Sequence, residues 1–225
     1  MTVADNVREV AERISRAAAR AGRRVEDIKL VAITKTIDID MILEAVAAGI
    51  KVLGENYLQE AKGKVAAIGH GVEWHMTGHL QRNKARDAVN LFDMVQTIDS
   101  LELAVELDKR ARSAGKVISG LIEINIGGEG SKSGISKEEL APLLRSLKLL
   151  NNLSIQGLMT IPPYFDEQEK VRPYFRALRE LRDNANREGF SLKELSMGMS
   201  HDFEVAVEEG ATMVRIGTAI FGERR

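Results

Sequence analysis

The chain has 225 residues and a formal net charge of −1, with 44% hydrophobic and 29% charged residues. This balance is typical of a globular protein, and the lack of a basic excess argues against a nucleic-acid partner. Cysteine is absent, which excludes disulfides, thiolate metal ligands and cysteine nucleophiles. No apolar run reaches membrane-spanning length, and the charged segment Met1 to Arg24 lacks the apolar region of a secretory signal, so we expect a cytoplasmic protein with no membrane partner.

Short β-branched runs alternate with longer amphipathic stretches along the whole chain. A helix is predicted first, over 3–21, and it precedes every strand. Strands are predicted over 28–34, 51–55, 72–77, 92–98, 117–126, 153–159, 193–197 and 212–217. The helices between them are predicted over 38–48, 57–68, 81–89, 100–114, 136–150, 167–188 and 201–209. Ser136 and Glu139 have the spacing of a capping box, which predicts that the helix over 136–150 begins there.

Eight strands with helices between them predict a parallel sheet, and eight is the number that closes a (β/α)8 barrel. An open, doubly wound sheet is the alternative. The barrel is favoured because polar residues follow nearly every strand, and the carboxyl ends of barrel strands gather at one mouth. Those residues are Lys35, Glu55, Asn56, His79, Asn125, Thr160, the segment 196–200 and the segment 215–218. No linker divides the chain, so we predict one domain over 1–225, a (β/α)8 barrel with an extra N-terminal helix.

Lys35 is the first candidate for chemistry because it stands where an apolar strand ends. It shares strand parity with Val31 and Ile33. Lys29 shares that parity too, but six residues at about 3.3 Å each place it roughly 20 Å away, at the other end of the strand. A lysine that is partly desolvated at the barrel mouth can supply the neutral amine that forms a Schiff base with an aldehyde. The alternative is an ordinary solvated lysine at a strand edge.

Two loops late in the chain carry residues suited to a phosphate. Ser196-Met-Gly-Met-Ser200 follows the seventh strand and Arg215-Ile-Gly-Thr218 follows the eighth, and a helix start is expected after each. Hydroxyl groups and backbone N–H groups at a helix start bind anions, and Gly217 lets the backbone approach a ligand closely. Ser200 also has a simpler explanation as a helix N-cap. Together with a Schiff-base lysine, the loops fit an aldehyde that carries a phosphate, and pyridoxal phosphate has both groups.

Arg215 and the histidines have structural as well as functional explanations. Arg215 lies two residues before Gly217 and is therefore predicted to point into the barrel, where a buried guanidinium needs an acceptor. Glu123 is the structural candidate for that acceptor, and the ring nitrogen of a cofactor is the functional one. His75 and His79 flank a strand end without a third ligand at a suitable spacing, so no metal site is predicted. The segment 127–134 does not match a Walker A loop and is predicted to be a flexible loop over the mouth.

Six motifs together are specific to one family. They are VAITKT at 31–36, GENYLQE at 54–60, WHMTGHLQRNK at 74–84, GLMTIP at 157–162, SMGMS at 196–200 and RIGTAIFG at 215–222. In these motifs the chain resembles the pyridoxal-phosphate homeostasis proteins, the YggS/PROSC family, whose fold is like the N-terminal barrel domain of alanine racemase. The resemblance runs from about Val25 to the C-terminus. Departures are small: Thr34 stands where many members have serine, and His201 replaces a residue that is often acidic or small.

The resemblance implies that pyridoxal 5'-phosphate is the cofactor. Lys35 would carry it as a Schiff base, Arg215 would face the pyridine nitrogen, and the two late loops would hold the phosphate. The cofactor-binding residues that it implies are Lys35, Asn56, His79, Ser196, Ser200, Arg215, Gly217 and Thr218.

A carrier of the cofactor is predicted rather than an enzyme. A racemase needs two bases on opposite faces of the substrate carbon and takes the second from an additional domain and a partner subunit, whereas the predicted barrel uses this whole chain. An arginine at the ring nitrogen also leaves that nitrogen unprotonated, which weakens the electron sink. We therefore expect a monomer that acts in vitamin B6 homeostasis and passes the cofactor to apo-enzymes. Two alternatives stay open: a small amino-acid enzyme with His79 or Tyr57 as second base, and a cofactor-free Schiff-base aldolase.

Overall fold

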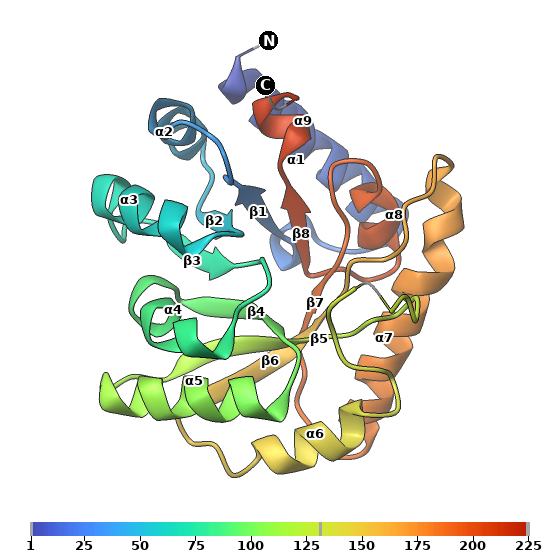
Figure 1. Cartoon of the computed structure of the whole chain (residues 1–225). Coiled ribbons are helices and arrows are strands. Elements are labelled where there is room, and N and C mark those ends of the chain that lie inside the picture. The colour runs from blue at the N-terminus through green and yellow to red at the C-terminus, as the bar shows by residue number, and fades with distance from the viewer. Residues whose placement is uncertain (1, 131, 224–225) are drawn as a thin grey trace.

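The computed structural model describes residues 2–130 and 132–223 and confirms the predicted barrel. Eight parallel strands follow one another around a closed sheet in chain order (Figure 1). They are β1 Lys29–Ile33, β2 Val52–Glu55, β3 Glu73–Met76, β4 Met94–Ile98, β5 Ile118–Glu123, β6 Leu153–Met159, β7 Glu194–Ser196 and β8 Met213–Ile216. The barrel closes where β1 pairs with β8, with Lys29 opposite Met213 and Val31 opposite Arg215. The alternative prediction, an open doubly wound sheet, is therefore wrong.

Helices surround the barrel, as Figure 1 shows. They are α1 Val3–Arg20, α2 Ile39–Ala47, α3 Leu58–Ile68, α4 Ala85–Leu91, α5 Leu101–Ser113, α6 Leu140–Leu147, α7 Arg172–Arg187, α8 Phe203–Glu208 and α9 Thr218–Phe221, with short 3-10 turns at η1 Val25–Asp27, η2 Arg82–Lys84 and η3 Gln168–Val171. The extra helix α1 begins with a capping box between Thr2 and Asp5 and packs against α2, α8 and α9. Across the described part of the chain, no helix combines the length and apolar character that a membrane crossing requires.

The helix predicted over 136–150 begins later than expected, at Leu140. The backbone N–H of Ser136 does donate to the Glu139 carboxylate, at 2.8 Å, but this bond closes a turn before the helix. The reason is that Ile135 forms a parallel β-bridge with Ile124, which keeps the chain extended up to that point. The predicted capping box at the start of this helix is therefore wrong.

Two hydrophobic cores position the site. A small cluster fills the barrel itself: Val31, Val52, Met94, Leu121, Met159 and Met213. A larger cluster lies between the outer face of the strands and the helices. Because the interior cluster occupies the middle of the barrel, polar side chains that point inward near the carboxyl ends of the strands gather above it, at the mouth.

Candidate functional site at the barrel mouth

The mouth of the barrel contains a cavity of about 280 Å³, which we call the Lys35 cavity. Of the eight predicted cofactor-binding residues, six line it: Lys35, Asn56, Ser200, Arg215, Gly217 and Thr218. Ile33, Ile161 and Met199 add apolar surface. The fold thus brings the strand-end lysine of β1 together with the loops that follow β7 and β8, although these segments lie far apart in the sequence.

Lys35 lies in a tight turn directly after β1 and is half-buried. The next residue, Thr36, has a φ of 62°, in the left-handed region that β-branched residues rarely adopt. Its backbone N–H donates to Oε2 of Glu60 at 2.7 Å. A strained turn of this kind persists only where its surroundings hold it, so the position of Lys35 depends on the contacts of its neighbours.

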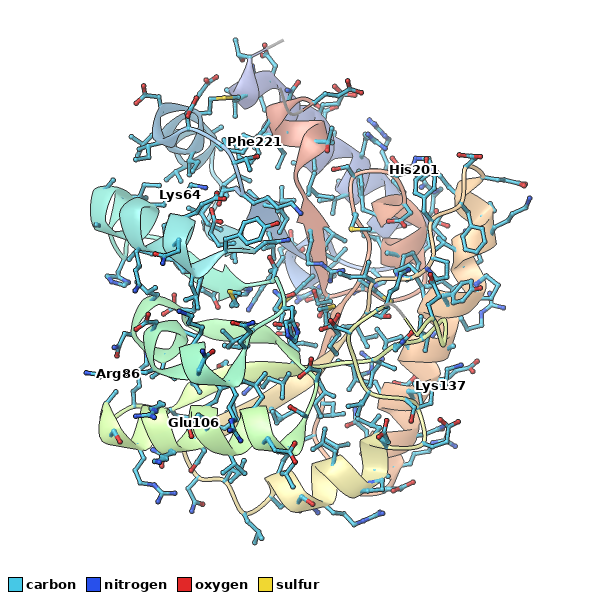
Figure 2. The ribbon with its side chains drawn as sticks, in the orientation of Figure 1. Lys64, Arg86, Glu106, Lys137, His201 and Phe221 are labelled. Atoms are coloured by element: carbon cyan, nitrogen blue, oxygen red, sulfur yellow. The ribbon has the colours of Figure 1, made fainter. Side chains whose placement is uncertain are left out.

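A buried ionic cluster behind this turn supplies those contacts. Nζ of Lys64 donates to the backbone oxygen of Thr34 at 2.5 Å, to Oε1 of Glu55 at 2.7 Å and to Oε2 of Glu60 at 3.1 Å. The Thr34 hydroxyl also donates to Oε1 of Glu55, at 2.6 Å. Burial raises the pKa of Glu55, while the hydrogen bonds from Lys64 and Thr34 act in the opposite direction. Figure 2 labels Lys64 on α3, the helix that follows β2.

Lys64 cannot be recognised as a site residue from the sequence. Its only local signal is the spacing of four residues from Glu60 on one helix, which surface ion pairs share. Its burial, with 7% of the residue exposed, is a tertiary feature.

The two late loops are tied to each other by Ser200. Its hydroxyl oxygen accepts hydrogen bonds from the backbone N–H groups of Gly217, at 3.3 Å, and Ala219, at 3.2 Å. The helix start expected after Gly217 is confirmed, because α9 begins at Thr218. Hydroxyl groups and backbone N–H groups therefore converge on one side of the Lys35 cavity, which is the donor set that a phosphate requires.

Arg215 points into the barrel from β8 and is 4% exposed. Its guanidinium donates to the Ser196 hydroxyl at 2.6 Å and to the backbone oxygen of Thr160 at 2.8 Å. Burial lowers the pKa of Arg215 to about 10, so it stays protonated at neutral pH. Glu123, the acceptor considered from the sequence, is not one of these hydrogen-bond partners. A guanidinium has five N–H donors, so Arg215 retains donors for an acceptor in the cavity.

Ser196 lies inside the barrel and does not line the Lys35 cavity. Its hydroxyl donates to Oε1 of Gln96 at 2.6 Å, and Nε2 of Gln96 lies 2.8 Å from Nδ1 of His75. Nε2 of His75 lies 3.0 Å from a Glu73 carboxylate oxygen, and this contact lowers the pKa of Glu73. A chain of polar contacts therefore runs through the barrel from Arg215 to Glu73 at the opposite end. This placement favours a structural role for Ser196 beneath Arg215 over contact with a phosphate.

His79 also lies off the Lys35 cavity, in the wall of two neighbouring cavities. Its Nδ1 is 3.3 Å from a carboxylate oxygen of Asp99, and its side chain is 55% exposed. Within the part of the chain that the structure describes, no three histidine, aspartate or glutamate side chains come together as a metal site would require.

The remaining strand-end candidates have structural partners. Asn125 binds the backbone of the following loop, through its side-chain amide, at Glu129 and Lys132. The Thr160 hydroxyl donates to the backbone oxygen of Ile124 at 2.8 Å.

The closed barrel, with a lysine after its first strand and loops rich in hydroxyl and backbone N–H groups after its last two, defines a class of protein. The sequence model described as "Alanine racemase, N-terminal domain" matches residues 6–225. An alanine racemase from Clostridium difficile 630, in complex with cycloserine, has the same fold, with a TM-score of 0.77 at 17% identity over 98% of this chain and 60% of that one.

Closer relatives define the family within this class. The "Pyridoxal phosphate homeostasis protein" of Aquifex aeolicus is 47% identical over 100% of both chains, and the protein of that name from Escherichia coli K12 is 41% identical over 99% of this chain and 97% of its own length. The structure of PipY from Synechococcus elongatus PCC7942 with PLP bound has a TM-score of 0.83 at 34% identity, over 95% of this chain and 100% of PipY. The chain therefore belongs to the family of pyridoxal phosphate homeostasis proteins.

Proposed function

We propose that the chain binds pyridoxal 5'-phosphate in the Lys35 cavity, holds it as a Schiff base on Lys35, and acts in the cytoplasm in the homeostasis of this cofactor. One observation carries the proposal: a lysine amine and a set of phosphate-type donors line a single cavity of about 280 Å³. A relative that is 34% identical, PipY, has been described with PLP bound. When bound, the cofactor supplies an aldehyde that reacts with amines.

Each part of the cofactor has a counterpart among the residues of the cavity. The amine of Lys35 meets the aldehyde. The hydroxyl groups of Ser200 and Thr218 hold the phosphate, and the backbone N–H of Gly217 exchanges its 3.3 Å bond to Ser200 for one to the phosphate. Arg215 donates to the pyridine nitrogen, with the donors that its bonds inside the barrel do not use. Asn56 lies beside the ring.

We propose a carrier rather than an enzyme. Of the two residues considered as a second base, neither His79 nor Tyr57 lines the Lys35 cavity. Arg215 is a donor only, so it leaves the ring nitrogen unprotonated and the electron sink weak. We also propose that the carrier is a monomer, as the sequence predicts. Tyr164 and Met199 line the cavity and are 73% and 37% exposed, so the cofactor would be accessible to recipient apo-enzymes.

The test is the visible absorption spectrum of the protein titrated with pyridoxal phosphate. A Schiff-base band should form in the wild type and be absent in Lys35→Ala. Lys29→Ala is the matched control, because it removes a lysine at the opposite end of β1 from Lys35, and it should keep the band. Borohydride reduction and peptide mass spectrometry should then locate the adduct at Lys35. A band that survives in Lys35→Ala, or an adduct at another lysine, would refute the assignment.

Turnover distinguishes the carrier from its alternatives. The cofactor-loaded protein should not racemise or deaminate amino acids, and measurable turnover that is lost in Lys35→Ala would establish an enzyme instead. If the protein forms no band with pyridoxal phosphate but cleaves a sugar phosphate in a reaction that is lost in Lys35→Ala, the aldolase alternative is correct.

A further inference from the structure

A second cavity, of about 220 Å³, adjoins the Lys35 cavity, and we call it the Glu123 cavity. Asn56, Thr77 and Ile161 line both cavities, so the two share a wall. Glu123 lines only the second. Nothing in the proposed function uses this space or this carboxylate.

Glu123 is an unusual group to find at this position. It lies at the end of β5, is 6% exposed, and its Oε2 is buried without a hydrogen-bond partner. Arg215 is close enough to influence it, but its guanidinium donates to Ser196 and Thr160. Burial raises the pKa of Glu123 to about 7, and the nearby carboxylate of Asp99 adds to the rise. A buried carboxylate that lacks a partner is costly, so a donor or cation in the cavity would be strongly favoured.

The surroundings of Glu123 define the kind of cation. The described residues include no group of three carboxylates or imidazoles that could hold a metal ion. The walls combine the Glu123 carboxylate with neutral oxygens, including the Thr97 hydroxyl and Oδ1 of Asn56. Lys132 also lines the cavity, but its ammonium group already binds the backbone oxygen of Pro162 at 3.0 Å and Oε1 of Glu129 at 2.7 Å. The imidazole of His79, in the same wall, lies 3.3 Å from a carboxylate oxygen of Asp99. A primary ammonium group is compact and has three donors, which suits one charged and several neutral acceptors.

We propose that the Glu123 cavity binds a small primary amine in its ammonium form, with Glu123 as its counter-ion. Its occupant would lie across a shared wall from Lys35, where the side chains of Asn56 and Thr77 contact both spaces. The site does not depend on the proposed cofactor, because all of its residues belong to this chain. The cofactor-free protein should therefore already bind amines.

The test is an NMR titration of the isotopically labelled, cofactor-free full chain with propylammonium chloride at about pH 8, where Glu123 is ionised. We expect saturable shifts of the Gly78 and Thr97 amides. Glu123→Gln should weaken binding roughly tenfold or more, since it removes the charge while keeping the shape. Glu123→Asp, which keeps the charge, should retain binding. The matched control is Glu138→Gln, which removes an exposed carboxylate, and it should bind as the wild type does.

The control ligand is 1-propanol, which has no charge, and we expect it not to bind. Three results would overturn the proposal: no saturable shifts with propylammonium, equal binding by the wild type and Glu123→Gln, or equal binding of 1-propanol. None of these outcomes bears on whether Lys35 forms a Schiff base, so the two proposals fail separately.

Discussion

Replacing Lys64 by methionine should destabilise the protein by about 3–5 kcal/mol, the range for a buried ion pair that loses one partner. Glu55 has no exposed surface, its Oε1 accepts from Lys64, and its Oε2 already lacks a hydrogen-bond partner. Without Lys64 the carboxylate has no counter-ion in this cluster. In a chain of this size each kcal/mol moves the melting temperature by about 2–4 °C, so the midpoint should fall by roughly 6–20 °C.

The loss of stability in Lys64→Met should depend on pH, because the Glu55 carboxylate can become neutral by binding a proton. Burial raises its pKa and Lys64 opposes the rise, so removal of Lys64 raises the folded-state pKa further. The folded variant then binds a proton more tightly than the unfolded chain does. Its destabilisation should therefore be small near the ordinary pKa of glutamate, about 4.3, and grow as the pH rises toward the folded-state value.

Urea unfolding, followed by the fluorescence of the buried Trp74, measures both effects. The matched control is Lys62→Met on the same helix, whose ion pair with Asp87 is about half exposed and should contribute under about 1 kcal/mol. The double variant Lys64→Met/Glu55→Gln should recover much of the lost stability, since no buried charge is left unpaired. An equal loss at about pH 5 and pH 8, with no recovery in the double variant, would refute an ionic role for the cluster.

Three further variants test other parts of the barrel. In urea unfolding, Glu123→Gln should be more stable than the wild type at about pH 8, by up to about 3 kcal/mol, and equally stable near pH 4. The reason is that the pKa of Glu123 is raised to about 7, so the wild type loses stability as the pH rises from the ordinary pKa of glutamate to 7. Equal stability at both pH values would contradict this. Gln96→Leu should cost about 1–3 kcal/mol by the same assay, since the buried Ser196 hydroxyl loses its acceptor; an unchanged midpoint would show that the bond is unimportant. In Gly78→Ala the new Cβ would lie 2.4 Å from the backbone oxygen of Asn56, so both the melting temperature and the affinity for pyridoxal phosphate should fall.

The barrel and most of the site could be predicted because their signals are local. Eight alternations of strand and helix are visible in the sequence, and a residue that directly follows a barrel strand must lie at the mouth. That rule alone brings Lys35, Asn56, Ser200 and Gly217 to one end of the barrel, and the structure finds all four around one cavity.

The direction of the Ser196 side chain could not be predicted from its motif. Ser196 and Ser200 share one motif, but Ser196 is still part of β7 and lies opposite Met213 of β8. Its hydroxyl therefore belongs to the barrel interior, whereas Ser200 belongs to the loop. The direction of a residue at a strand end depends on where the strand stops, which the sequence does not define to one residue.

The pairing of β1 with β8 has a consequence for how the protein is made. Lys35 follows β1, the loop with Gly217 follows β8, and α1 packs on α8 and α9 beside this pairing (Figure 1). On the ribosome Lys35 emerges long before the loop that faces it. Until β8 has emerged, Lys35 has no cavity beside it, because Arg215, Gly217 and Thr218 are part of the wall. The Lys35 cavity forms only when β8 pairs with β1, so under the proposed function a bound cofactor would report a closed barrel.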